Sequence, residues 1–384
     1  MITREEFITL TSEEVHQAIA QAVHRDPLDI ALDRKIPHAR LVASQVKYLQ
    51  RAARKLPHYA QAQCIIPSLA FEQSSSEACA MTKSLHGKRV LDLTCGLGVD
   101  AWYLSRQFDH VVTIERDALL AEVARENFRR LGAENIEVVN ASSEDYVRQT
   151  TEHFDWIYAD PDRRGQDGRK KVCLEDCSPN MITLMPRLRE LANGICIKNS
   201  PLFDIDEAFR LFGACHVEVL SHGDECKEVV IYLQGEEQRL TATAIGQGSY
   251  TTLITDQQIT PPAQFLRDDY RWLIVPDVSL QKARLARQAI SAQADIWTEN
   301  GFAFATTMPH DILGRVFQIE NIDRYDPRTI KRQYKGMKAE IWKRDFPLRT
   351  EEVMRRTGLR AGSDLRLALT KIGNDYWTIR LKTK

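Results

Sequence analysis

The chain has 384 residues, of which 43% are hydrophobic and 27% are charged, and its formal net charge at pH 7 is −1. This length exceeds an average single domain, so we expect two or three domains with sizeable cores. No apolar run reaches the length of a membrane span, and the amino terminus lacks the layout of a secretory signal, so we expect a cytoplasmic protein without a membrane partner. Eight cysteines without a Cys-x-x-Cys pair argue against a disulfide framework and against a zinc or other metal site.

Charge is unevenly distributed along the chain. Residues 321–384 contain 17 Lys and Arg against 8 Asp and Glu, so the carboxyl-terminal sixth is basic and the remainder is acidic. A basic surface of this kind attracts polyanions. We therefore consider a nucleic acid as a partner, with an ordinary solvated surface as the alternative.

The first 60 residues have the pattern of helices. A helix-start signal at residues 11–14 precedes apolar residues at helical spacing, and a second helical stretch runs from His38 to Lys55. The basic face of this second stretch is either a solvated helix surface or one side of an RNA-binding groove.

Further on, Ser74 and Glu77 have the spacing of a capping box. This spacing predicts a helix start whose backbone amides could hold a carboxylate.

Residues 88–101 form the stretch around which the rest of the chain is organised. A buried strand ends at Asp92, a turn contains Gly96 and Gly98, and a helix follows. Glycines let the backbone turn tightly and approach a ligand without a Cβ in the way. In open α/β sheets, such a turn at the carboxyl end of the first strand binds the ligand.

Two ligands are candidates for this turn. With Glu115 nineteen residues after Gly96, the dinucleotide fingerprint is satisfied, so NAD is one candidate. Asp92 argues against NAD, because a carboxylate at the strand tip repels a pyrophosphate. S-adenosylmethionine (SAM) carries an ammonium and a sulfonium and no phosphate, and a second acid suits its ribose hydroxyls. We therefore predict SAM as the cofactor, and a turn without a ligand is the remaining alternative.

Strands and helices alternate after residue 88, which predicts a mostly parallel sheet with right-handed crossovers. A closing hairpin at residues 217–233 supplies an antiparallel last strand. After the third strand, Ser142 and Ser143 are candidates for recognising an adenine amino group. The other expected strands cover residues 111–114, 136–139, 154–158 and 195–197.

The pattern changes after residue 234, where Thr- and Gln-rich sequence and then short mixed elements follow. The fold class we predict is α/β, a Rossmann-like sheet with an amino-terminal helical segment and a small carboxyl-terminal α+β domain. The predicted segments are 1–60 (helical), 61–235 (the Rossmann-like unit), 236–270 (a strand-rich connector) and 271–384 (the α+β module). Within the module we expect a helix at 279–294 and a basic helix near 331–338.

The tip of the fourth strand carries Asp160-Pro161-Asp162-Arg163-Arg164. Methyl transfer needs in-line placement of the acceptor, and removal of a proton if the acceptor is an amine. Asp160 and the neighbouring peptide carbonyl can hold a base amine, and Arg163 can clamp a phosphate or stack on a base. The alternative is that Asp160 caps the next turn and the arginines pair with acids.

Cys177 offers a different chemistry. A thiolate could add to C6 of a pyrimidine and activate C5 for methylation. A buried, unreactive thiol is the alternative.

Taken together, these motifs resemble those of the class I SAM-dependent methyltransferases. More narrowly, the chain is similar to a bacterial group of such enzymes with a THUMP-like carboxyl-terminal domain. The runs that carry this resemblance are 71–77, 92–100, 175–179 and 199–201, with 276–277 and 343–348 in the tail.

The resemblance implies a role for each matching position. It implies Glu115 at the ribose, Ser142 or Ser143 at the adenine, and Asp160 and Arg163 at the transfer site. Amine-methylating nucleic-acid enzymes usually carry a proline and an aromatic residue where this chain has Asp162 and Arg163. The positions implied at the methionine part of SAM and at the border of the cofactor are Asp92, Thr94, Gly96, Gly98, Gln73 and Ser75.

The predicted function is that of a SAM-dependent methyltransferase acting on structured RNA, either tRNA or rRNA. The THUMP-like resemblance and the basic tail imply that the carboxyl-terminal domain docks the substrate. One alternative is a non-catalytic protein that binds SAM or a nucleotide and interacts with RNA. Another is a methyltransferase for proteins or small molecules.

Overall fold

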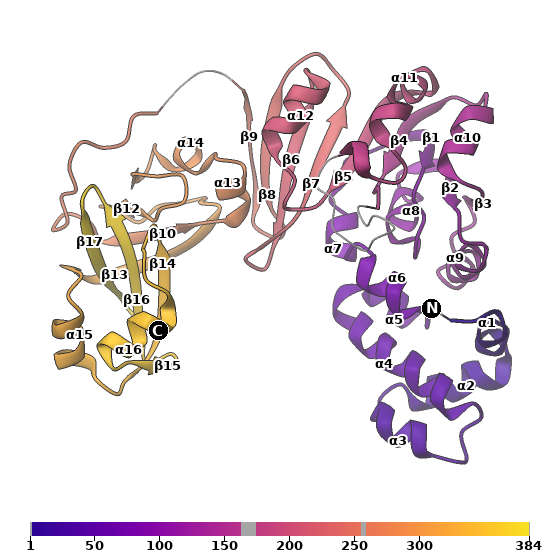
Figure 1. Ribbon diagram of the computed structural model, residues 1–384, viewed down its shortest axis with the longest axis horizontal. Coiled ribbons are helices and arrows are strands. Elements are labelled where there is room, and N and C mark those ends of the chain that lie inside the picture. Colours follow the sequence, from indigo (N-terminus) through magenta and orange to yellow (C-terminus); the bar gives the residue numbers. More distant parts are fainter. Residues whose placement is uncertain (1, 163–173, 255–258, 384) are drawn as a thin grey trace. The chain divides into compact units, whose positions relative to one another are not determined.

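The computed structural model describes residues 2–162, 174–254 and 259–383. Figure 1 shows the chain from the amino-terminal helices in indigo to the carboxyl-terminal strands in yellow. It forms two compact units. The first comprises residues Met1–His216 and Glu228–Glu237, and the second comprises Val217–Lys227 and Gln238–Lys384.

The first unit begins with short helices. Thr3 caps the first of them, accepting the backbone N–H of Glu6 at 3.1 Å. Val42, Val46 and Leu49 lie at helical spacing on one face of the longest and are buried, which confirms the predicted helical segment. These helices are α1 (Arg4–Thr11), α2 (Glu13–Ala22), α3 (Pro27–Leu32), α4 (Ala39–Lys55), α5 (Pro57–Gln61), α6 (Ser68–Gln73) and α7 (Glu77–Ala80).

The core of the first unit is a mostly parallel sheet with the strand order β3-β2-β1-β4-β5-β7. Only the last pair in this order, β5 with β7, is antiparallel. The strands are β1 (Gly87–Asp92), β2 (Phe108–Glu115), β3 (Ile136–Asn140), β4 (Phe154–Ala159), β5 (Ala192–Asn199) and β7 (Glu225–Leu233). The connecting helices are α8 (Val99–Leu104), α9 (Ala118–Arg130), α10 (Ser143–Gln149), α11 (Met181–Leu191) and α12 (Ile205–Phe212).

The direction of these strands determines where a site can form. Val90 and Leu91 of β1 are both buried, as expected for a strand covered on both faces. Because the parallel strands point the same way, their carboxyl ends meet at one edge of the sheet, where open α/β sheets bind ligands. The residues at these ends are Asp92, Glu115, Asn140, Ala159 and Asn199.

The second unit is rich in strands. One hydrophobic cluster of this unit includes Leu273, Phe304 and Ile379, and another includes Ile330 and Leu367. Three strands, β6 (His216–His222), β8 (Arg239–Ala244) and β9 (Gly248–Leu253), precede an eight-stranded sheet with the order β11-β12-β10-β13-β17-β16-β14-β15. Its strands are β10 (Trp272–Pro276), β11 (Asp295–Ile296), β12 (Ala303–Ala305), β13 (Gly314–Arg324), β14 (Lys338–Arg344), β15 (Arg360–Ala361), β16 (Leu365–Ile372) and β17 (Asp375–Leu381).

Two helix predictions in this unit were wrong in extent. The helix expected at 279–294 is divided into α13 (Val278–Lys282) and α14 (Ala286–Ile290), because Arg284 between them has a left-handed backbone with φ of +57°. The basic helix expected near 331–338 is α15 (Pro327–Tyr334), which starts earlier because Asp326 caps it. A last helix, α16 (Thr350–Thr357), packs against α15.

Among the residues described, no helix combines the length and the apolar character that crossing a membrane requires.

Candidate cofactor and transfer site

The glycine turn connects β1 to α8. Gly96 and Gly98 have φ values of +55° and +86°, which side-chain-bearing residues seldom adopt. A Cβ on Gly98 would lie 2.5 Å from Cζ of Phe128 on α9. The turn therefore requires glycine at position 98 for two reasons, the backbone angle and the closeness of Phe128.

Asp92 lies buried at the start of this turn, with no exposed surface. Its Oδ1 accepts the backbone N–H of Thr94 at 2.9 Å, and its Oδ2 accepts the hydroxyl of Thr113 at 2.6 Å. Burial raises the pKa of Asp92 to about 7, and the hydrogen bonds oppose this shift. The hydrogen bonds of Asp92 connect the turn to β2 and hold its shape.

Glu115, at the end of β2, contacts the same turn. Its Oε2 accepts the backbone N–H of Gly96 at 2.9 Å, and its Oε1 accepts that of Asp117 at 2.8 Å. Burial raises the pKa of Glu115. Each carboxylate oxygen has a second lone pair, so the side chain retains the capacity to accept hydroxyl groups.

Ser142 and Ser143 stand at the start of α10, next to the same edge. The Ser142 hydroxyl donates to the Asp145 carboxylate at 2.7 Å and accepts the Asp145 backbone N–H at 3.1 Å. The Ser143 hydroxyl donates to the carbonyl oxygen of Leu93 at 2.6 Å. Ser143 thus ties α10 to the residue after β1.

Asp160 follows β4 and lies against the glycine turn, because its backbone N–H donates to Oγ1 of Thr94 at 2.7 Å. Asp162 and Ser178 exchange backbone hydrogen bonds of 2.8 and 2.9 Å, which brings the segment with Cys177 beside this strand end. Cys177 is buried. Arg163 lies outside the described residues.

A group of buried ionisable side chains adjoins Asp160, and the sequence analysis missed it. Lys198, near the end of β5, forms an ion pair with Asp160 and donates to Oγ of Ser75 at 2.9 Å. The Ser75 hydroxyl in turn donates to Asp100 on α8 at 2.5 Å. Gln73 is exposed at the end of α6, two residues before Ser75. The one signal in the sequence was a lysine directly after the apolar run at residues 195–197.

The predicted capping box of Ser74 and Glu77 was wrong. Ser76 caps α7 instead, accepting the backbone N–H of Cys79 at 3.2 Å. Glu77 is 2% exposed and accepts the His58 backbone N–H at 2.9 Å and the Tyr103 hydroxyl at 3.0 Å. A buried carboxylate requires such hydrogen-bond partners. Glu77 therefore connects α5 to α8 and does not form the predicted capping box with Ser74.

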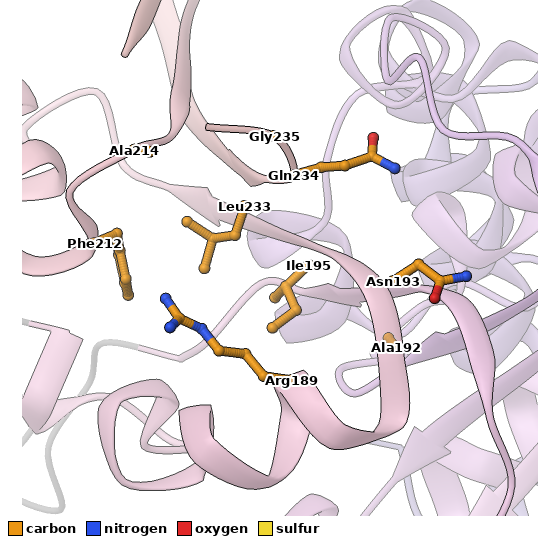
Figure 2. Close-up of a pocket in the computed structure, with 9 residues that line it drawn as sticks. All are labelled: Arg189, Ala192, Asn193, Ile195, Phe212, Ala214, Leu233, Gln234 and Gly235. Atoms are coloured by element: carbon orange, nitrogen blue, oxygen red, sulfur yellow. The ribbon is translucent and has the colours of Figure 1, made fainter. Parts of the chain in front are cut away.

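A cavity of about 350 Å³ lies away from this edge. Figure 2 shows Arg189, Ile195 and Leu233 among the residues that line it. Ala192 and Asn193 also line it and lie at the amino end of β5, so this cavity is separate from the glycine turn at the opposite edge of the sheet. In the described parts of the chain, no three His, Cys, Asp or Glu side chains are arranged to hold a metal ion.

The fold is one found in solved methyltransferase structures, as predicted. Along its whole length the chain superposes on the solved structure of a "putative methyltransferase" from Porphyromonas gingivalis W83, with a TM-score of 0.82 and 24% identity. The superposition covers 100% of this chain and 99% of the other, so it includes the carboxyl-terminal domain.

Sequence comparison agrees with the fold. Residues 73–175 match the family model "Conserved hypothetical protein 95", and residues 314–382 match the model "THUMP domain-like". An uncharacterized S-adenosylmethionine-dependent methyltransferase of Mycobacterium tuberculosis (strain ATCC 25618 / H37Rv) is 25% identical over 343 residues, which cover 84% of this chain and 90% of the relative. The predicted resemblance to SAM-dependent methyltransferases and to a THUMP-like carboxyl-terminal domain is thus confirmed.

A more local match involves RNA-modifying enzymes. The 23S rRNA (uracil(1939)-C(5))-methyltransferase RlmD of Xylella fastidiosa is 44% identical over 82 residues. These residues are 21% of this chain and 18% of the relative, so the similarity is confined to a short part of each protein.

Proposed function

We propose that this protein is a cytoplasmic enzyme that transfers a methyl group from SAM to a structured RNA, either tRNA or rRNA. The observation that carries the proposal is the hydrogen bond of 2.7 Å between Thr94 and Asp160. It joins the glycine turn, where we propose the cofactor binds, to the tip of β4, where we propose the acceptor binds.

The cofactor site is proposed at the carboxyl edge of the sheet. Glu115 would accept the ribose hydroxyls, and Ser142 or Ser143 would face the adenine. Asp100, Asp160 and Glu228 outnumber Lys83 and Lys198, the two lysines with which they pair. This excess of negative charge suits a ligand with an ammonium and a sulfonium and disfavours a pyrophosphate. The residues proposed around the methionine part are Gln73, Ser75, Asp92, Thr94, Gly96 and Gly98.

Asp160 is the proposed catalytic residue, and Arg163 would assist in holding the substrate. When bound, SAM supplies a methyl group activated by its sulfonium. The Asp160 carboxylate can orient an acceptor amine and take up the proton that the amine loses. Burial raises the pKa of Asp160, which makes it a better proton acceptor at neutral pH than an ordinary carboxylate.

The RNA substrate is supported by the carboxyl-terminal domain. Exposed basic side chains gather on α15 and α16, which pack together. The THUMP-like match covers both helices, and the local relatives include an rRNA methyltransferase. Lys and Arg side chains bind the phosphate backbone of RNA, so this domain would dock the substrate. The exposed basic residues are Arg328, Lys331, Arg332, Lys335, Arg355 and Arg356.

Methyl transfer can be tested directly with purified protein, SAM labelled in its methyl group and total RNA from cells that lack the protein. We expect label in RNA with the wild type and a large loss with Asp160→Ala, while both bind S-adenosylhomocysteine. Binding without transfer to any acceptor would favour the non-catalytic alternative. Label in protein or in small molecules, with none in RNA, would favour the other alternative.

A further inference from the structure

Five ionisable side chains form a continuous row from the interior of the first unit to the carboxyl edge of the sheet, where Asp160 lies. Deepest is the pair of Lys83 and Glu228, whose Nζ and Oε1 are 2.8 Å apart. Lys83 also lies 3.4 Å from Oδ1 of Asp100, and Lys198 lies 3.9 Å from Oε2 of Glu228. The row of side chains ends with the ion pair of Lys198 and Asp160.

The exposed fraction of these side chains increases along the row toward the edge of the sheet. The side chain of Lys83 is 1% exposed, that of Lys198 is 12% exposed, and that of Asp160 is 26% exposed. Asp160 is therefore the side chain of this row that a substrate can reach. Lys198 lies immediately behind it.

Lys198 stays charged in this position. Burial alone would lower the pKa of its ammonium group, but the Asp160 and Asp100 carboxylates raise it to about 12. The ammonium donates to Asp160 and to Ser75, so it connects the end of β4 to the segment after α6. A charged group held by two hydrogen bonds has one well-defined position.

A purely stabilising role does not explain why a second lysine, Lys198, is present here. The Lys83 and Glu228 pair already connects the segment after α7 to β7. A further ion pair that is largely removed from water carries a desolvation cost and adds little net stability, and replacing a whole pair of this kind by apolar residues often stabilises a protein. Groups of this kind concentrate at functional sites, where their position matters more than their stability.

We propose that Lys198 is a positioning residue for methyl transfer, which holds the Asp160 carboxylate in place at the acceptor side while Ser75 is held at the cofactor side. This inference depends on the proposed function, because it assigns Asp160 to the acceptor. Asp100 and Glu228 attract the ammonium of Lys198 from behind, and Lys83 pairs with both of these acids.

The test compares Lys198→Met, which keeps an unbranched apolar stem but removes the charge, with Lys198→Arg, which keeps the charge. In Lys198→Met we expect kcat for methyl transfer to RNA to fall on the order of 10- to 100-fold, because a small displacement of Asp160 has an effect of this size. KM for RNA and the affinity for S-adenosylhomocysteine should change much less. Lys198→Arg should recover part of kcat. Lys88→Met, on the exposed start of β1, is the matched control.

Crystal structures of the wild type and Lys198→Met give a second readout that needs no substrate. We expect the Asp160 carboxylate to leave its wild-type position in the variant. Should Lys198→Met not fold, Lys198→Gln, which keeps a hydrogen-bond donor, replaces it in both measurements.

Three results would overturn the proposal: an unchanged kcat, a loss of S-adenosylhomocysteine affinity in proportion to kcat, or an Asp160 carboxylate that does not move. Failure of the proposed function is distinguishable. In that case the wild type itself would transfer no methyl group to RNA, and the position of Asp160 in the two crystal structures would still decide the role of Lys198.

Discussion

The carboxylate of Glu115 accepts the backbone N–H of Gly96 at 2.9 Å, although the two residues are nineteen positions apart in the chain. The acid proposed for the ribose therefore also shapes the turn proposed for the methionine part. A single side chain couples the two halves of the proposed cofactor site.

Replacing Glu115 should weaken cofactor binding strongly. In Glu115→Ala both the ribose partner and the acceptor for Gly96 are removed, so we expect SAM affinity to fall at least about tenfold, as for the loss of a charged hydrogen-bond acceptor. Glu115→Gln keeps one acceptor oxygen and should have a smaller effect. Calorimetric titration with SAM and with NAD measures both. Measurable NAD binding by the wild type would contradict the assignment of the cofactor.

Substitution of Gly98 should destabilise the first unit. Gly98→Ala introduces a strained backbone angle and a close approach to Phe128, and we expect a loss of about 3 kcal/mol in the free energy of unfolding. Gly132→Ala is the matched control, because Gly132 also has positive φ but a Cβ at this position would have no neighbouring atom within 4 Å. The control should lose about 1 kcal/mol. Equal losses in urea unfolding of the two variants would show that the closeness of Phe128 is unimportant.

The buried carboxyl group of Asp92 should make stability depend on pH. Its pKa is raised from 3.8 to about 7 in the folded protein, so the folded state binds a proton that the unfolded state releases between these values. The contribution of Asp92 to the free energy of unfolding therefore decreases as pH rises from about 4 to about 7, and it is constant above that range.

Asp92→Asn removes this titration and tests the argument. We expect the variant to gain stability relative to the wild type by on the order of 1 kcal/mol per pH unit across this range. Urea unfolding at several pH values measures the difference. Asp109→Asn, at an exposed position of β2, is the control. A difference between Asp92→Asn and the wild type that does not vary with pH would be inconsistent with a raised pKa.

The basic helices of the second unit should dominate RNA affinity. We expect Lys331→Gln combined with Arg332→Gln and Arg355→Gln to weaken RNA binding and to reduce the slope of its salt dependence by roughly 0.7 to 0.9 for each phosphate that is no longer neutralised. Lys88→Gln combined with Arg148→Gln is the control in the first unit. Fluorescence anisotropy with the full-length chain at several salt concentrations measures both. An unchanged slope in the triple variant would mean that RNA docks elsewhere.

The sheet and the glycine turn could be predicted because their signals are local. Buried strands are apolar runs, and the spacing from Gly96 to Glu115 is short and characteristic. The structure brings together Asp92, Thr94, Glu115 and Asp160 at one edge, since each residue lies at or beside the carboxyl end of a parallel strand. Their contacts with SAM stay predictions, as do the domain boundaries at residues 60, 235 and 270.

Other features depend on distant parts of the chain. Lys83 and Glu228 are 145 positions apart, so nothing near either residue indicates that they form a pair. Glu77 has the spacing of a helix cap, but its carboxylate accepts hydrogen bonds from His58 and Tyr103, which lie on other helices. Arg284 interrupts a pattern that is otherwise helical. In each case tertiary contacts or backbone conformation outweigh the local signal.

Methylation of RNA by this protein is tested most directly by mass spectrometry of nucleosides from cells that lack it. We expect one methylated nucleoside to be missing from tRNA or rRNA. It should return when the wild type is restored but not when Asp160→Ala is expressed at the same level. An RNA methylation profile identical in all these cells would mean that the protein does not methylate RNA.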